Sequence, residues 1–200
     1  MGLDEEEETL PPALAPGVVP PERIEVEGLV LRRWTPDDLQ GRLEALIASY
    51  ELLYPWMEWM REPPTLESQR AWDELRGTAW PGATGFNYGI FDAADGSVLG
   101  AISAMDRVGP GGLEIGYWCH VAHTGKGVIT RATRELTRIL FELDGVERVE
   151  IHCDEANARS AAVPRRLGYR LDRIEDDRVH TAPLDSGRSM VWIKERESTA

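Results

Sequence analysis

The sequence has little of what marks several large classes of protein. Its 200 residues include only two cysteines, Cys119 and Cys153, without metal-ligand spacing around them, so we expect two buried, reduced thiols and no metal site. No apolar run approaches about 18 residues, which predicts no transmembrane helix and no membrane partner. Residues 4–8 are acidic where a secretory signal needs positive charge, so we expect a cytoplasmic protein.

Positive charge is also scarce, and acidic residues outnumber basic ones. The chain has 22 Lys and Arg against 35 Asp and Glu, a formal net charge of −13, which would repel nucleic-acid phosphates and argues against that partner. The same balance suits a cationic or amine-bearing acceptor. Part of the negative charge lies in residues 1–22, together with five prolines. That composition predicts a flexible tail, followed by one domain over residues 23–197.

Residues 113–143 carry the strongest local pattern in the chain. Residues 114–121 are apolar and aromatic, as in a buried strand, and the glycines at 125 and 127 allow the left-handed backbone of a tight turn. From Val128 onward, apolar residues recur at helical spacing. A glycine turn that opens a helix presents unpaired N–H groups and a partial positive charge, which suits a phosphate. Many strand–turn–helix units bind nothing, so this pattern alone leaves both interpretations open.

Motifs further along the chain give this turn a context. Residues 148–153 form a second candidate strand, and Asn157, Ser160 and the Leu-Gly-Tyr of residues 167–169 follow it as N-x-x-S-x(6)-L-G-Y. This order of strand, glycine turn, helix, strand and motif resembles the GNAT family of acyl-CoA-dependent N-acyltransferases.

Two further segments narrow the resemblance to the RimJ/RimL-like branch, which contains ribosomal-protein N-terminal acetyltransferases. They are Glu-Ile-Gly-Tyr-Trp at residues 114–118 and Pro-Trp-Met-Glu-Trp at residues 55–59. The resemblance covers roughly residues 27–194. It implies an α+β fold with a mixed, mostly antiparallel sheet of six to seven strands, flanked by about four helices. It also implies that the sheet is splayed between its fourth and fifth strands, where the pantetheine arm of the cofactor inserts.

The resemblance implies acetyl-CoA, or another acyl-CoA, as the co-substrate, bound at the glycine turn. The family's loop is Q/R-x-x-G-x-G/A, and Ala122 stands at its first position here, which removes one side-chain contact but keeps the glycines. Lys126 or Arg131 could add charge at the phosphates, and the N–H of Val121 is the expected oxyanion donor. Asn157 is expected at the pantetheine arm. The residues expected to bind the cofactor are Cys119, Val121, Thr124, Gly125, Lys126, Gly127, Val128, Ile129, Thr130 and Asn157.

Two residues are expected to carry the proton transfers. By resemblance, Ser160 is the proton donor to the leaving thiolate, whereas Tyr169 is expected to serve in packing. Glu114 is a carboxylate in an apolar strand, where burial would raise its pKa towards that of a useful general base; a structural hydrogen bond or salt bridge is the alternative. His120 is a second candidate base. His152 alternates with an apolar neighbour, which predicts a strand histidine with satisfied hydrogen bonds.

Aromatic residues gather where an acceptor could bind. Trp56, Trp59 and Trp118 are expected to line the acceptor site, although the segment with Trp56 and Trp59 suits a plug between two helices equally well. At pH 7 an α-amine of pKa about 7.7–8.0 is roughly 10–20% neutral, against below about 0.1% for a lysine. A site without a clearly strong base therefore suits a protein N-terminus or a small amine of low pKa.

These expectations predict an N-acyltransferase, most simply an acetyltransferase, in which the amine attacks the thioester directly in a ternary complex. A covalent route through Cys119 is a minor alternative, because nothing nearby clearly lowers its pKa. A CoA-binding module without catalysis and a nucleotide-binding α/β protein are the rivals from other classes. The expected partners are an acyl-CoA and the amine acceptor, and a homodimer stays open.

Overall fold

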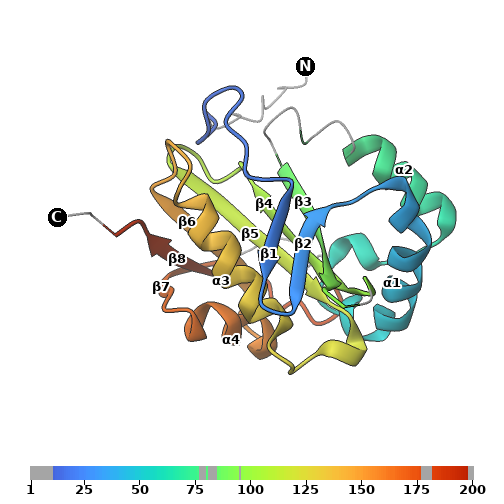
Figure 1. Ribbon diagram of the computed structural model, residues 1–200. Helices are drawn as coiled ribbons and strands as arrows, with labels where there is room; N and C mark the ends of the chain where they lie inside the picture. Colours follow the sequence, from blue (N-terminus) through green and yellow to red (C-terminus); the bar gives the residue numbers. More distant parts are fainter. Residues whose placement is uncertain (1–10, 77–79, 81–84, 95, 177–181, 198–200) are drawn as a thin grey trace, which may run out of the picture.

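One mixed sheet of eight strands organises the molecule, in the order β1-β2-β3-β4-β5-β6-β8-β7 (Figure 1). The computed structural model describes residues 11–76, 80, 85–94, 96–176 and 182–197. Every neighbouring pair is antiparallel except β5 and β6, which run parallel. The predicted sheet type is confirmed, with eight strands instead of six to seven. The strands are β1 (Arg23–Val26), β2 (Leu29–Arg33), β3 (Gly85–Asp92), β4 (Val98–Met105), β5 (Gly112–Cys119), β6 (Arg148–Asp154), β7 (Arg170–Asp176) and β8 (Arg188–Glu195).

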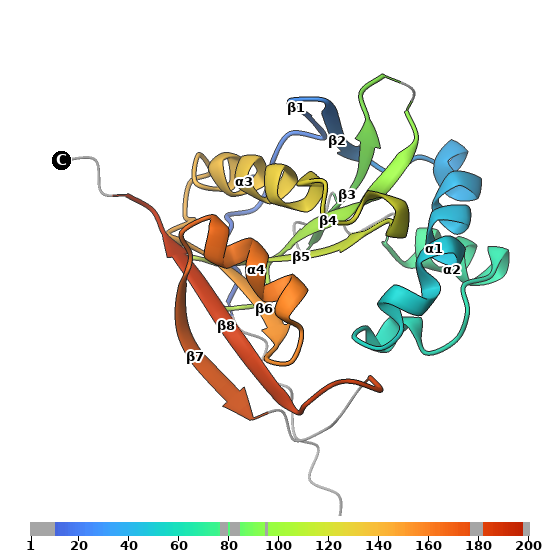
Figure 2. The same ribbon diagram turned by 90° about the horizontal axis from the view of Figure 1, so that it is seen from below.

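The helices cover both faces of the sheet. Figure 2 shows α3 and α4 on one face and α1 and α2 on the other. In the described part of the chain α3 packs against β4, β5 and α4, while α1 packs against β4 and α2. The α-helices are α1 (Leu39–Leu53), α2 (Leu66–Arg76), α3 (Val128–Leu140) and α4 (Ala158–Arg166), and the short 3-10 helices are η1 (Pro36–Asp38), η2 (Glu58–Met60) and η3 (Val121–His123).

Helix α3 shows how the apolar periodicity becomes packing. Gly127, at φ 75°, takes the left-handed conformation directly before the helix begins, a conformation that a side chain disfavours. The apolar stripe that follows includes Ala132, Leu136 and Leu140, each 0% exposed in the main core. Burying such a stripe, rather than intrinsic helix propensity, supplies most of a helix's stability. The N-terminus of α3 is thereby fixed just after the end of β5.

Strands β5 and β6 separate soon after they meet. Their parallel ladder contains only three pairs and ends at Glu114 opposite Glu150, although β5 continues to Cys119 and β6 to Asp154. On its other side β5 stays paired with β4 through Cys119. The predicted splay therefore lies between the fifth and sixth strands here, because β1 and β2 form a separate hairpin at the start of the sheet.

The segment before β1 corrects part of the predicted tail. Leu14 is buried in the main core, and the N–H groups of Ala13 and Leu14 donate to the Asp106 carboxylate at 2.8–3.2 Å. The Tyr88 hydroxyl donates to the carbonyl of Pro21 at 2.8 Å. Residues 11–22 therefore lie against the domain, because burial of Leu14 and these bonds offset the ordering of a proline-rich chain. Residues 1–10 of the predicted tail lie outside the described residues.

Candidate active site

The glycine turn before α3 presents backbone N–H groups to the outside. Gly125 and Gly127 have φ 73° and 75°, and the first amide with an acceptor at this end of the helix is that of Arg131, which donates to the Gly127 carbonyl at 3.0 Å. The described residues supply no acceptor for the N–H groups of residues 125–130. Residues 124–127 are exposed. Such a set of free N–H groups at a helix N-terminus is the geometry that binds a phosphate or pyrophosphate.

Side chains around the turn fall into two groups. Val128 and Ile129 point into the core, so they can contribute only their N–H groups to a ligand. Lys126 is exposed at the tip, where its charge can reach an anion. The Arg131 Nε is buried and has no partner among the described residues, which fits a guanidinium that binds an anionic ligand. The Thr124 hydroxyl donates to the Val121 carbonyl at 3.0 Å and holds the loop together.

The edge of β5 that faces the divergence carries free backbone groups. The His120 N–H donates to the Leu99 carbonyl at 2.9 Å in continuation of the β4–β5 ladder. Because N–H groups alternate in direction along a strand, those of Tyr117 and Cys119 point the other way, past the last β5–β6 pair. An extended ligand can pair with such an edge as an added strand. This arrangement fits the expected pantetheine arm beside Cys119.

The N–H of Val121 needs a correction. It donates to the Ser49 Oγ of α1 at 2.9 Å, and Ser49 is fully buried. The predicted oxyanion donor is therefore already bonded within the protein, through a contact 72 residues apart in the chain. Sequence spacing carries no signal for such a contact. The remaining N–H on the open edge nearest to this position is that of Cys119.

The thiol of Cys119 is poorly suited to act as a nucleophile. Burial raises its pKa to about 11, so almost none of it is thiolate at neutral pH. Cys153, on β6 across the divergence, is likewise raised to about 11 by burial. Both cysteines are free thiols. These values disfavour the covalent alternative and favour direct attack by the amine.

Ser160 and Asn157 meet β5 through a residue that the sequence interpretation missed. The Asn157 Oδ1 accepts the Ser160 N–H at 3.1 Å and caps α4. The Ser160 hydroxyl donates to the Tyr117 hydroxyl at 3.3 Å, which in turn donates to the Ser160 carbonyl at 3.0 Å. Burial raises the pKa of Tyr117 well above its usual value, so its phenol stays protonated. Strand alternation could have identified Tyr117 from the sequence, because Tyr117 lies on the same face of the strand as the buried Ile115.

Tyr169 has the packing role expected of it. Its hydroxyl shares a 2.6 Å hydrogen bond with the Thr137 hydroxyl inside the core. His120 has a local role as well, because its Nδ1 accepts the Ala122 N–H at 3.1 Å and caps η3. Burial and the neighbouring His123 lower the pKa of His120. That bond commits one ring nitrogen to the loop before α3.

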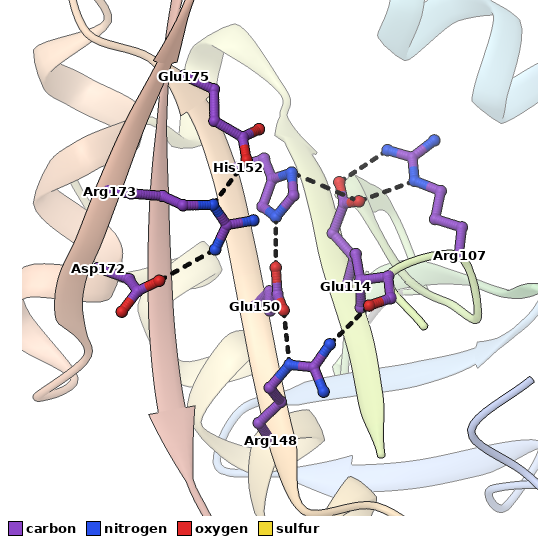
Figure 3. Close-up of polar contacts among 9 residues, drawn as sticks. Arg107, Glu114, Arg148, Glu150, His152, Asp172, Arg173 and Glu175 are labelled. Carbon is purple, nitrogen blue, oxygen red and sulfur yellow. Dashed lines mark hydrogen bonds and ion pairs between the residues drawn. The ribbon is translucent and has the colours of Figure 1, made fainter. Parts of the chain in front are cut away.

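Glu114 is held as an ion pair, the alternative left open for it. Arg107 donates from Nε and Nη2 to the two carboxylate oxygens, at 2.8 and 2.7 Å. Glu114 is buried and lies between the Arg107 guanidinium and the His152 ring (Figure 3). A bidentate arginine occupies both oxygens at which a carboxylate would accept a proton. The structure therefore does not favour Glu114 as the direct base.

His152 lies beside this pair on the same face of the sheet. Its Nε2 is 2.7 Å from a Glu150 oxygen, and its Nδ1 is 3.8 Å from Glu114 Oε2 (Figure 3). Burial lowers the pKa of His152, but the bond to Glu150 and the charges of Glu114, Glu150 and Glu175 outweigh burial and raise it above its usual value. For Glu150, bonds from His152 and Arg148 outweigh burial and lower the pKa. The predicted satisfied hydrogen bond is confirmed at one ring nitrogen.

The predicted acceptor tryptophans have different surroundings. Trp118 packs on the small cluster formed by Leu46, Leu53 and Met60, on the same face of β5 as Glu114. Trp59 is 57% exposed, and Trp56 is half-buried. Met60 therefore supplies the plug between helices, while Trp59 is available at the surface. The loop before β8 lies against this segment, since the Leu184 N–H donates to the Pro55 carbonyl at 2.9 Å.

Two further observations concern other classes of site. Within the ranges that the structure describes, no group of three or more His, Cys, Asp or Glu side chains could hold a metal ion. Among the described helices, none is both long and apolar enough to cross a membrane.

Comparisons with known proteins agree with this geometry. The family model for the acetyltransferase (GNAT) domain matches residues 28–170. The Bacillus subtilis (strain 168) protein named "Putative ribosomal N-acetyltransferase YdaF" is 31% identical over 150 residues, which cover 72% of this chain and 78% of that protein.

Solved structures share the fold. RimL, a ribosomal L7/L12 α-N-protein acetyltransferase solved with coenzyme A, matches with a TM-score of 0.77 at 20% identity, over 87% of this chain and 98% of that one. Mycobacterium smegmatis RimJ, solved with CoA-disulfide, matches with a TM-score of 0.76 at 19% identity, over 94% and 91%. The family match spans most of the sheet, the glycine turn and the N-x-x-S motif, so the chain belongs to the GNAT family and is an acyl-CoA-dependent N-acetyltransferase.

Proposed function

We propose that the protein transfers an acetyl group to the α-amine of a protein N-terminus. The observation that carries the proposal is the divergence of β5 from β6 after Glu114, with free N–H groups along one edge and proton-bearing side chains on both faces. The names of YdaF, as a ribosomal N-acetyltransferase, and of RimL, as an α-N-protein acetyltransferase, support this class of acceptor. Acetyl-CoA supplies an acyl group activated as a thioester.

The chain's own residues suit each part of such a co-substrate. The N–H groups of residues 125–130, with Lys126 and Arg131, would hold the phosphates. The edge of β5 at Tyr117 and Cys119 would pair with the pantetheine arm, and the side-chain amide of Asn157 lies at the opposite side of the divergence. The Cys119 N–H is the better candidate for the oxyanion donor than the predicted Val121 N–H, because the Val121 N–H is bonded to Ser49.

The leaving thiolate needs a proton from the α4 face. Ser160 and Tyr117 form a pair of hydroxyls there, and both are protonated at neutral pH. When Ser160 gives up its proton, the Tyr117 hydroxyl can turn to donate to the Ser160 oxygen and replace it. Proton donation from such a positioned pair typically accelerates a transfer by about 100-fold or more.

The opposite face suits an acceptor that is part of a longer chain. Trp118 forms its floor and packs against the cluster that includes Met60. Trp59, which precedes Met60, and Leu184, whose N–H bonds to the Pro55 carbonyl, are 57% and 55% exposed. Exposed apolar side chains beside a reactive site commonly contact the residues that follow the reacting group in a peptide. A small amine would be too short to contact these side chains.

The test compares three acceptors at fixed acetyl-CoA. They are a lysine-free peptide with a free N-terminus, the same peptide with a blocked N-terminus and one added lysine, and spermidine. Thiol release gives the rate, and intact-mass and fragment spectra locate the acetyl group. We expect kcat/KM for the free α-amine to exceed that for the lysine by about 100-fold or more, the ratio of their neutral fractions at pH 7.

Other outcomes decide between the alternatives. Faster turnover of the lysine peptide or of spermidine would overturn the α-amine assignment while leaving the acetyltransferase intact. Binding of acetyl-CoA without thiol release for any acceptor would instead support the CoA-binding module.

A further inference from the structure

The two ring nitrogens of His152 have different surroundings. Nε2 is within hydrogen-bonding distance of Glu150, at 2.7 Å. Nδ1 is 3.8 Å from the nearest oxygen of Glu114, which is beyond a hydrogen bond. The side chain keeps 25% of its surface exposed. One nitrogen is therefore anchored, and the other is left for a group that approaches this face.

Glu150 sets which nitrogen carries the proton. It is buried, and hydrogen bonds from His152 and Arg148 keep its pKa low, so it is an ionised carboxylate that can only accept. Arg148 donates to Glu150 at 2.7 Å and to the carbonyls of Val108 and Pro110 at 2.6 Å, which fixes the carboxylate. The neutral ring must then hold its proton on Nε2, so Nδ1 carries the lone pair. A carboxylate that fixes a histidine tautomer in this way prepares it for proton transfer.

The register places His152 at the mouth of the divergence. Glu114 opposite Glu150 is the last β5–β6 pair, and side chains two residues apart share a face of a strand. His152 is thus the first β6 side chain on this face beyond the ladder, across from Gly116, over which the end of the Met105 side chain lies. Trp118, the floor of the acceptor face, is the next β5 residue on that face.

We propose that His152 is the base that takes a proton from the acceptor ammonium, and that Glu150 is the positioning residue that fixes its tautomer. This inference rests on the proposed function. The ammonium loses one proton to Nδ1, and the neutral amine then forms the N–C bond to the acetyl carbon as the C–S bond breaks. The nitrogen loses its second proton to water as the amide forms. The thiolate takes a proton from the Ser160–Tyr117 pair, and water returns a proton to that pair. His152 returns its proton to solvent through its exposed side.

The charges around His152 fix the sign of the pH dependence. The neighbouring carboxylates raise the pKa of His152. In the profile of activity against pH, we therefore expect the limb that reports deprotonation of His152 to lie above pH 6.5, the usual pKa of a histidine. Activity should rise with pH through that limb, because the neutral ring is the base. The charged groups that face or adjoin it are Glu150, Arg148 and Asp154 from β6, Glu114 from β5, Arg107 from the loop before β5, and Arg173 and Glu175 from β7 with Asp172 behind Arg173.

The experiment measures kcat/KM against pH for the full chain with acetyl-CoA and two α-amine peptides of different amine pKa. A limb that belongs to the acceptor moves with the peptide, whereas a limb that belongs to His152 does not. We expect His152→Gln to lower kcat/KM by about 100-fold or more and to remove the peptide-independent limb. The affinity for acetyl-CoA, measured by calorimetry, should stay unchanged.

Three further variants separate a catalytic role of His152 from a structural one. His152→Ala should regain at least part of its lost rate with added imidazole, which a merely structural role would not allow. Glu150→Gln and Glu175→Gln should each move the limb to lower pH, because each removes a charge that raises the pKa of His152. Glu175 is exposed, so its variant stays informative if Glu150→Gln fails to fold. Glu142→Gln, in the exposed turn that follows α3, is the matched control and should leave the limb in place.

Failure of this inference differs from failure of the proposed function. If the unaltered protein acetylates α-amines but His152→Gln keeps its rate and its limb, His152 is not the base. If the unaltered protein acetylates no amine, the proposed function fails first.

Discussion

The two faces of the sheet at the β5–β6 divergence hold opposite kinds of chemistry. On the α3/α4 face, burial raises the pKa of Cys119 and Tyr117, so these groups remain neutral and protonated. On the other face, Glu114 and Glu150 are buried as partners of arginines, and His152 lies between them. This difference indicates the direction of proton transfer at each face. Protons can be donated to a leaving thiolate from the first face and accepted from an ammonium on the second.

The largest expected effect comes from removing what both faces depend on, the phosphate anchor. Gly127→Val forces a β-branched residue into φ 75° and puts a side chain over the free N–H groups, although no protein atom lies within 4 Å of its Cβ. We expect the dissociation constant for acetyl-CoA, measured by calorimetry, to rise by about 100-fold as charge-assisted bonds to phosphate are lost.

Its matched control is Gly17→Val, which occupies φ 87° and also meets no atom within 4 Å. Either variant is expected to lose about 1–3 kcal/mol of unfolding free energy from backbone strain. Only Gly127→Val should lose the ligand. Normal affinity in a folded Gly127→Val protein would remove the turn from the site.

The next largest effect comes from variants that change only the α3/α4 face, whose groups remain neutral and protonated. Ser160→Ala should lower kcat by about 100-fold, and Tyr117→Phe by about 10-fold, the value of one hydrogen bond. Neither should change the affinity for acetyl-CoA, because the phosphate anchor is untouched. Stopped-flow thiol release gives kcat for each variant.

Tyr169→Phe serves as the control for this face. It removes another buried phenol of raised pKa, which is bonded to Thr137 and not to Ser160, and should cost only about 1 kcal/mol of stability. If Tyr169→Phe slows turnover as much as Tyr117→Phe does, the Ser160–Tyr117 pair has no special role.

Much of the backbone framework could be predicted, because it depends on patterns within short stretches. The apolar spacing after Val128 predicted α3, and the glycines predicted the left-handed turn. Asn157 and Ser160 were placed on one face by their spacing of three. The Val121–Ser49 bond and the Arg107–Glu114 pair could not be predicted, since each joins residues whose proximity depends on how helices and loops pack over the sheet.

Some of what was missed did leave a signal. Glu150 and His152 are two residues apart in a strand, so alternation alone places them on one face. The same rule places Tyr117 and Trp118 on opposite faces of the sheet. Leu14 lies in a proline-rich and acidic stretch whose composition predicts a tail, because composition cannot identify a single apolar residue that packs in the core.

The smallest expected effect distinguishes the role of Glu114 from that of Glu150, the two buried carboxylates on the face opposite α3 and α4. Glu114→Gln keeps an oxygen for Arg107 and keeps the Glu150–His152 hydrogen bond, while it removes one of the charges that raise the pKa of His152. We therefore expect kcat to fall by less than about 10-fold. The unfolding free energy, measured in urea, should fall by about 1–2 kcal/mol because a buried charge-assisted pair is weakened. A loss as large as that of His152→Gln would restore Glu114 as the base.

The central claim is that an open helix N-terminus and the free edge of β5 together hold acetyl-CoA. Titration of ¹⁵N-labelled protein with CoA, followed by amide chemical shifts, tests it most directly. We predict that the largest shifts fall on residues 125–130 and on Tyr117 and Cys119, with Val121 changing less because Ser49 holds its N–H. Saturable binding that leaves residues 125–130 unperturbed would contradict the account.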